Sequence, residues 1–218
     1  MAFGLENQKE ADTQMGVMVN NAHDYFGQWV PPRSNLLSAM EAEAEAEGIP
    51  IVGPVLGQWL YLLAKLKNAR QIIELGTATG YSAIFLGSAC SSTKGHLTTF
   101  EIDPQMARRA KANIEKADLK DFIDVQCTKA LKGLEEVAYQ ADMIFMDIEK
   151  LDYEPALAVC KQKLRKNGLL VADNTGFRDA HGFNRSIFDD ADWESINLWA
   201  LLPGHSPEHD GVCLALKR

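Results

Sequence analysis

Two apolar runs of this sequence end in side chains that carry oxygen atoms suited to binding a cation. The run "MIFM" (143–146) is followed at once by Asp147, and "GLLVA" (168–172) is followed by Asp173 and Asn174. Such short apolar runs are typical of buried strands, and the carboxyl ends of parallel strands meet at one edge of a sheet. Two carboxylates and an amide oxygen are an oxygen-only set that suits Mg²⁺ or another divalent cation.

Each of these side chains also has an ordinary structural interpretation. Asp147 could cap a helix, and Lys150 could be a surface residue in the first turn of that helix. Asp173 and Asn174 form a dipeptide that is common in turns. The metal hypothesis is favoured because both polar endings follow consecutive predicted strands and because a second ligand site is predicted upstream.

The upstream site lies in "ELGTATGYS" (74–82), where Gly76 and Gly80 bracket a tight turn that opens a helix. Glycine allows close approach of a ligand to the backbone, and the free N–H groups at a helix start favour an anion. The pattern is not the G-x-G-x-x-G of dinucleotide sites, because Ala78 and Tyr81 break it.

A second predicted strand ends at Glu101, which stands 21 residues after Gly80. An acid at this distance can accept hydrogen bonds from ribose hydroxyls. The glycine turn and this acid together predict an adenosine ligand that carries a carboxylate instead of a pyrophosphate. S-adenosylmethionine fits that description.

The elements that must position these residues alternate regularly from residue 55 onward. Five predicted strands are each followed by a predicted helix, and they span 71–75, 96–102, 122–127, 141–148 and 168–173. Two more strands, 195–202 and 211–218, are joined by a linker too short for a crossover helix, so they should be antiparallel. We therefore expect an α/β fold with a Rossmann-like, seven-stranded, mostly parallel sheet, its last strand antiparallel and helices on both faces.

The first 50 residues look like an N-terminal helical extension of a single domain that spans 1–218. Residues 35–47 should form one helix, with Ser34 as N-cap and Gly48 as stop. Residues 5–27 are a candidate for another. The acidic repeat "EAEAEAE" (41–47) is expected to be a solvated helix face.

Charge and cysteine content narrow the class of protein. The net charge is −8, which argues against binding nucleic acid or an anionic membrane. The four cysteines, at 90, 127, 160 and 213, lack metal or redox spacing, so they are expected to be reduced core thiols. With neither a signal peptide nor an apolar run of membrane length, the sequence predicts a cytoplasmic protein.

Four stretches in this order resemble the catechol and caffeoyl-CoA O-methyltransferase family: "IIELGTATGYSAIFL", "TFEIDPQMARRAKANIEKA", "MIFMDIEKLDYEPAL" and "KNGLLVADN". The upstream "IPIVGPVLGQWL" and the closing "EHDGVCLALKR" also fit, so the resemblance covers roughly residues 49–218. It implies a class I, S-adenosylmethionine-dependent and metal-dependent enzyme. Asn184, in "GFN", matches a Phe-Asn pair often seen in the family.

The resemblance also assigns roles to single residues. Glu74 would contact the methionine amino group, Glu101 the ribose hydroxyls and Ile102 the adenine. The residues that it implies for cofactor binding are Val52, Glu74, Gly76, Thr77, Tyr81, Ser82, Glu101, Ile102, Ala130 and Asp147. The stretch "TKA" (128–130) stands where the family usually has Gly-Asp-Ala, and only Ala130 matches.

At the polar strand ends, the resemblance implies that Asp147, Asp173 and Asn174 bind a divalent metal, which chelates two adjacent substrate hydroxyls. Lys150 would be the catalytic base, acting with Asp147. A lysine is protonated at neutral pH, so this role requires a nearby dication and partial burial. The link from Asn174 to Phe183 is shorter than in caffeoyl-CoA enzymes, which favours a small aromatic diol as substrate.

Two other functions stay open. Some bacterial relatives methylate a wobble 5-hydroxyuridine of tRNA, a function that a basic stripe near Arg108, Arg109 and Lys111 would favour and the net charge disfavours. An NAD-dependent oxidoreductase is a second alternative, although the third glycine of the dinucleotide pattern is absent.

Relatives are often dimers, so a homodimer is expected. We expect His181, His205 and His209 to be exposed loop residues and Trp29, Trp193 and Trp199 to serve in packing or at an interface.

Overall fold

The computed structural model describes residues 18–218, and these fall into two units, one ending at Val30 and one spanning Pro31–Arg218. The first unit contains helix α1 (Ala22–Gly27), capped by the side chain of Asn21, with the rings of Tyr25, Phe26 and Trp29 against one another. The predicted helix over 5–27 lies mostly outside the described residues. The expectation of one domain over 1–218 stays a prediction.

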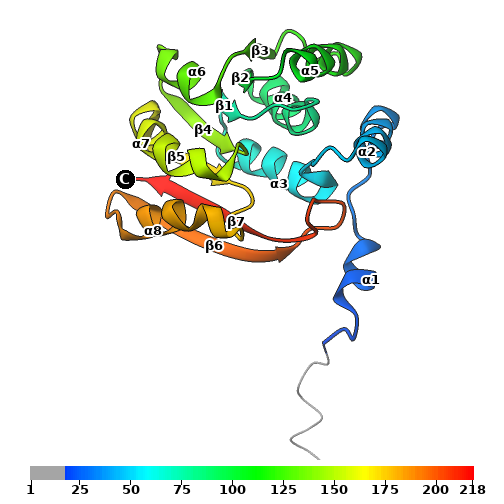
Figure 1. Cartoon of the computed structure of the whole chain (residues 1–218). Helices are drawn as coiled ribbons and strands as arrows, with labels where there is room; N and C mark the ends of the chain where they lie inside the picture. The colour runs from blue at the N-terminus through cyan, green and yellow to red at the C-terminus, as the bar shows by residue number, and fades with distance from the viewer. Residues whose placement is uncertain (1–17) are drawn as a thin grey trace, which may run out of the picture. The chain divides into compact units, whose positions relative to one another are not determined.

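The second unit is built on a seven-stranded sheet in the order β3-β2-β1-β4-β5-β7-β6 (Figure 1). The strands are β1 (Gln71–Leu75), β2 (His96–Glu101), β3 (Ile123–Cys127), β4 (Ala141–Met146), β5 (Leu164–Ala172), β6 (Trp193–Leu201) and β7 (His209–Lys217). Neighbours from β3 to β5 are parallel, whereas β7 runs antiparallel to both β5 and β6. The predicted Rossmann-like fold is confirmed.

Helices cover both faces of this sheet (Figure 1). One apolar core lies between the sheet and the helices α2 (Asn35–Glu47), α3 (Gly53–Leu66), α4 (Tyr81–Thr93) and α5 (Pro104–Lys116). The other core lies between the opposite face and the helices α6 (Ala130–Glu136), α7 (Tyr153–Lys163) and α8 (His181–Asp189). Because side chains alternate across a strand, the central strands are buried on both faces and read as continuous apolar runs.

Local sequence signals explain several of these boundaries. Helix α2 begins where the Ser34 hydroxyl accepts the N–H of Leu37 at 3.3 Å, and it ends at Gly48 in the left-handed conformation. Helix α5 begins with Pro104 at its first turn, after Asp103 as N-cap. These predicted boundaries are confirmed to within a residue.

Other expectations were wrong in detail. Strand β5 begins at Leu164, four residues before the predicted start, because it pairs with Ala141 across an irregular register before the regular ladder begins at Leu169. Cys127 is exposed, whereas Cys90, Cys160 and Cys213 are buried, and all four are free thiols. Between residues 18 and 218, no helix is both long and apolar enough to cross a bilayer.

Candidate active site

The turn after β1 is shaped by a close approach of two backbones. Gly76 has φ +94°, and a Cβ atom there would collide with the carbonyl oxygen of Asp147, at the end of β4. Glycine is therefore required both for the conformation and for the space. Ala78, two residues after Gly76, also has positive φ and donates its N–H to Glu101 at 2.8 Å.

Glu74 is a fully buried carboxylate near the end of β1. Its Oε2 accepts the Thr99 hydroxyl at 2.6 Å, but no group in the described chain completes a hydrogen bond of ordinary geometry to its buried Oε1. Burial raises the pKa of Glu74 to about 7, since the hydroxyls of Ser82 and Thr99 offset it only in part. A cationic donor at Oε1 would satisfy this carboxylate.

Glu101 ends β2 with its carboxylate held by the backbone. Oε2 accepts the N–H of Ala78 and Oε1 accepts the N–H of Asp103, each at 2.8 Å. Both oxygens keep a further acceptor position. Because two hydrogen bonds fix the carboxylate, it is oriented to receive a pair of hydroxyls.

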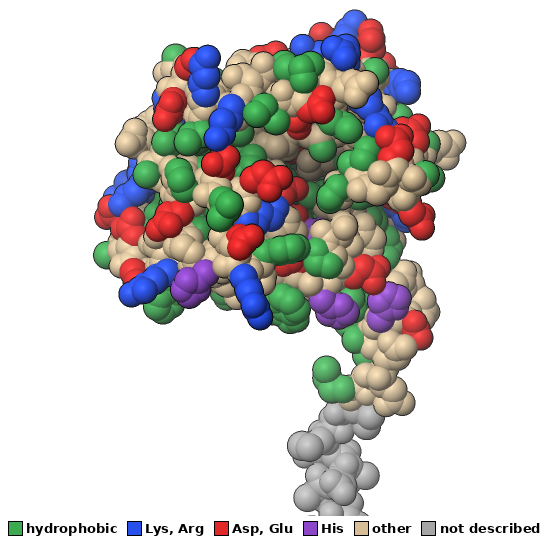
Figure 2. Space-filling view, in the orientation of Figure 1, with side chains coloured by type: hydrophobic (Ala, Val, Ile, Leu, Met, Phe, Trp, Pro, Cys, Tyr) green, Lys and Arg blue, Asp and Glu red, His purple; other side chains and the backbone are tan. Residues whose placement is uncertain are grey.

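The predicted site residues gather around two adjoining cavities of about 360 and 100 Å³ at the carboxyl ends of β1, β2, β4 and β5. The larger is lined by Gly76, Glu101, Ile102, Ala130, Asp147, Lys150, Asp173 and Asn174. The smaller is lined by Val52, Gly76, Thr77, Tyr81, Ser82, Glu101 and Asp147. Of the predicted site residues, Glu74 is the one that lines neither cavity. Figure 2 shows a hollow in this face, beside α2, with acidic side chains at its rim.

Asp147 and Asp173 both line the larger cavity and lie close enough to interact electrostatically. The pKa of Asp147 is raised to about 6, first because the carboxylate loses solvation and second because of the negative charge of Asp173. Lys150 opposes this, with Nζ 3.2 Å from Oδ1 of Asp147 and 3.0 Å from the carbonyl of Ile148. The site therefore concentrates negative charge that a cation would stabilise.

Asn174 is oriented by Asp210, at the start of β7. Nδ2 of Asn174 donates to Oδ2 of Asp210 at 2.6 Å, so the amide oxygen is the atom left for another partner. Asp210 is itself fixed by the N–H groups of Gly176 and Gly211. This positioning role was not predicted, because the closing Asp-Gly stretch matched only a structural feature of the resemblance.

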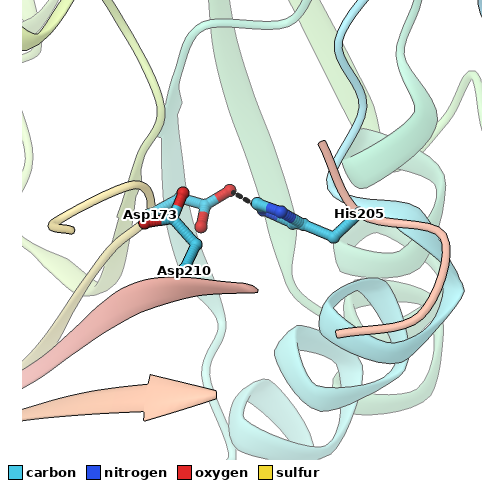
Figure 3. Close-up of side chains that lie close together, drawn as sticks. All are labelled: Asp173, His205 and Asp210. Atoms are coloured by element: carbon cyan, nitrogen blue, oxygen red, sulfur yellow. Dashed lines mark hydrogen bonds and ion pairs between the residues drawn. The ribbon is translucent and has the colours of Figure 1, made fainter. Parts of the chain in front are cut away.

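The expectation that His205 is exposed is wrong. His181 and His209 are exposed as expected, but His205 is only 5% exposed. Its Nε2 lies 2.8 Å from Oδ2 of Asp173 (Figure 3). Burial works to lower the pKa of His205, yet the hydrogen bond and charge of Asp173 outweigh it, and the pKa is raised above 6.5. The contact joins the β6–β7 loop to the end of β5, so local sequence gave no signal for it.

Helix α2 is tied to the glycine turn and to α5 by its glutamates. The Tyr81 hydroxyl donates to Glu41 at 2.5 Å, and Arg33 pairs with the same carboxylate at 3.0 Å. Arg109 pairs with Glu47 at 2.6 Å. The acidic repeat is therefore only partly a free solvated face, and Arg109 is not available for a basic stripe.

Comparison with known proteins decides the family. A family model described as O-methyltransferase matches residues 37–193. The chain belongs to the O-methyltransferase family, and it is an O-methyltransferase. It is 34% identical over 199 residues to catechol O-methyltransferase of Niastella koreensis, covering 83% of this chain and 89% of that protein. Catechol O-methyltransferase of Mycobacterium tuberculosis is 30% identical, covering 82% and 80%.

A solved structure agrees with this assignment. The O-methyltransferase of Bacillus cereus, in complex with SAH, superposes with a TM-score of 0.80 at 26% identity. The match covers 89% of this chain and 96% of that one. This O-methyltransferase therefore shares its fold with almost the full length of the Bacillus cereus enzyme.

Proposed function

We propose that this O-methyltransferase uses S-adenosylmethionine to methylate one hydroxyl of a small catechol-like substrate, a vicinal dihydroxy aromatic, with a divalent cation such as Mg²⁺. The observation that carries the proposal is one cavity that is lined both by Gly76 and Glu101 and by Asp147, Asp173 and Asn174. The two relatives named catechol O-methyltransferase support the substrate class.

The acids Glu74 and Glu101 fit the methyl donor. The donor's ammonium group is a suitable partner for Oε1 of Glu74, which lacks a hydrogen bond. Glu101 has free acceptor positions for ribose hydroxyls, with Ile102 and Ala130 beside it in the same cavity. The remaining proposed contacts, around the methionine end, are Val52, Thr77, Tyr81 and Ser82. Because the Tyr81 hydroxyl donates its hydrogen bond to Glu41, Tyr81 would contact the methyl donor with its ring and backbone.

The carboxylates fit a divalent cation. Asp147, Asp173 and the amide oxygen of Asn174 would hold it, and the pKa of Asp147 is raised by lost solvation and by the charge of Asp173, which Lys150 offsets only in part. When bound, such a cation favours the ionised form of a substrate hydroxyl, whose pKa as a phenol is otherwise about 10. Lys150, whose Nζ now donates to Asp147, would take the hydroxyl proton once the charge of the cation had displaced its own proton.

The surroundings of Lys150, which lines the larger cavity, already include aromatic rings. Nζ of Lys150 lies 6.0 Å from the centre of the Phe177 ring and 5.4 Å from that of Tyr153. Phe177 is exposed, and we propose that its ring contacts the aromatic acceptor. The short link after Asn174 leaves the entrance without a longer cover, which favours a small acceptor.

Neither alternative function gains support. A tRNA substrate would require free basic groups for its phosphates, and Arg109 is paired with glutamates of α2. An oxidoreductase would require a pyrophosphate loop, and the turn after β1 has one glycine too few. The proposed cytoplasmic location and the homodimer remain predictions.

The test compares ligands and acceptors. S-adenosylhomocysteine should raise the melting temperature and NAD should not. Methyl transfer should occur to catechol but not to phenol, which has no second hydroxyl. Asp147→Asn should lower turnover roughly a hundredfold or more while S-adenosylhomocysteine still binds, and the exposed Asp121→Asn should match the wild type. Equal activity on phenol, or full activity of Asp147→Asn, would refute the proposal.

A further inference from the structure

His205 brings an imidazole to a site for which the sequence predicts oxygen ligands only. It lies in the loop between β6 and β7, is almost fully buried, and points at the carboxylate of Asp173 (Figure 3). Within residues 18–218, the side chains of Asp173, His205 and Asp210 form a group whose ligand atoms all lie within 4.8 Å of one another. The proposed function assigns His205 no role.

The hydrogen bonds of His205 fix which nitrogen carries a hydrogen. Nδ1 lies 2.5 Å from the carbonyl oxygen of Pro207. A carbonyl oxygen can only accept a hydrogen bond, so Nδ1 must be the N–H donor. Nε2 is therefore the nitrogen whose lone pair is available in the neutral ring. Histidines that bind metals typically donate their other N–H in this way to a backbone carbonyl or a carboxylate.

The position of Nε2 matches that of a ligand beside Asp173. Nε2 is 2.8 Å from Oδ2 of Asp173. Two ligands at right angles, each about 2.1 Å from one cation, lie about 3.0 Å apart. The two atoms are therefore spaced like adjacent ligands of an octahedral ion, and a lone pair and a carboxylate at this distance would repel each other unless a proton or a cation lay between them.

Asp210 is already used by its neighbours. One of its oxygens accepts Asn174, and the other accepts the N–H groups of Gly176 and Gly211. It therefore positions the Asn174 amide, whereas Nε2 of His205 points directly at the Asp173 carboxylate.

We propose that His205 is a direct nitrogen ligand of the divalent cation, next to Asp173 and Asn174. This inference deepens the proposed function and rests on its cation. An imidazole in the ligand set favours first-row transition ions such as Mn²⁺ or Co²⁺ over Mg²⁺, which prefers oxygen. A metal centre with this imidazole would then select a different cation from a centre with oxygen ligands only.

The test reads the ligand directly, without turnover. The protein is loaded with Mn²⁺, and pulsed electron paramagnetic resonance is used to look for coupling to an imidazole nitrogen. We expect ¹⁴N coupling in the wild type and its replacement by ¹⁵N coupling after labelling with ¹⁵N-histidine. Bound Mn²⁺ without any histidine nitrogen coupling would overturn the inference. This measurement needs no variant and so does not depend on a substitution folding correctly.

Variants identify which histidine is responsible. His205→Gln should lose the coupling and bind Mn²⁺ at least about tenfold more weakly by calorimetry, with a smaller loss for Mg²⁺. The exposed His209→Gln should leave both unchanged. Coupling that survives in His205→Gln, or unchanged Mn²⁺ affinity, would overturn the inference.

Two results separate this inference from the proposed function. Histidine-bound Mn²⁺ in a protein that methylates no catechol would refute the proposed substrate and support His205 as a ligand. Methyl transfer that requires a cation, with no histidine coupling, would support the proposed function and refute His205.

Discussion

At the scale of single residues, function depends on polar side chains that the fold holds in one orientation. The amide of Asn174 is oriented by the bond from its Nδ2 to Asp210, and Oε1 of Glu74 is a buried atom without a hydrogen-bond partner among the described residues. Such atoms are costly to bury unless a ligand satisfies them. Asp147 and Asn174 were recognisable from the sequence because each follows an apolar strand, whereas Glu74 was assigned only through the family resemblance. His205 and Asp210 were not recognisable, because their contacts join residues more than 30 positions apart.

Glu74 makes stability depend on pH. Its pKa is raised from 4.5 to about 7 by burial, so the folded state binds a proton that the unfolded state has released in this range. The stability that this proton supplies is present below pH 4.5 and is lost as the pH rises towards 7. Glu74→Gln, which cannot ionise, should unfold with up to about 3 kcal/mol more free energy at pH 8 than the wild type.

Urea unfolding of the ligand-free protein at pH 8 and pH 5 checks this expectation. The difference between Glu74→Gln and wild type should shrink markedly at the lower pH. The same variant should bind S-adenosylhomocysteine more weakly at pH 8, because the ammonium loses its carboxylate. A difference in stability that does not change with pH would show that Glu74 is not ionising in this range.

At the scale of elements, the strand and helix order was predictable because apolar runs mark the strands, and caps or proline mark the starts of helices such as α2 and α5. The start of β5 was not, because "LRKNG" carries the Asn-Gly signal of a turn. The structure instead continues the strand through it, with Asn167 at positive φ beside the irregular register. Long-range pairing with β4 overrides the local signal.

Close packing of β1 against β4 makes Gly76 irreplaceable. Gly76→Ala should lower the free energy of unfolding by about 2–4 kcal/mol, because it adds a clash with the Asp147 carbonyl to the cost of positive φ. Gly48, also at positive φ but with open space around it, is the matched control. Gly48→Ala should cost only about 1 kcal/mol. Equal losses in urea unfolding would contradict the close approach.

At the scale of the whole molecule, the family match and the cavities lie within the unit Pro31–Arg218. Exposed rings of Tyr25, Phe26 and Trp29 lie in the other unit. We predict that the full chain is a dimer and that a chain without residues 1–30 is a monomer that still binds S-adenosylhomocysteine. Light scattering after gel filtration measures both masses, and a monomeric full chain would contradict the prediction.

Cation dependence is the central claim, because Asp147, Asp173 and Asn174 have no other proposed role together. The most direct measurement is methyl transfer from S-adenosylmethionine to catechol before and after the cation is removed with EDTA. We predict that turnover is lost, that S-adenosylhomocysteine still binds, and that Mg²⁺ or Mn²⁺ restores the rate. Full activity in protein shown by elemental analysis to hold no divalent metal would contradict the account.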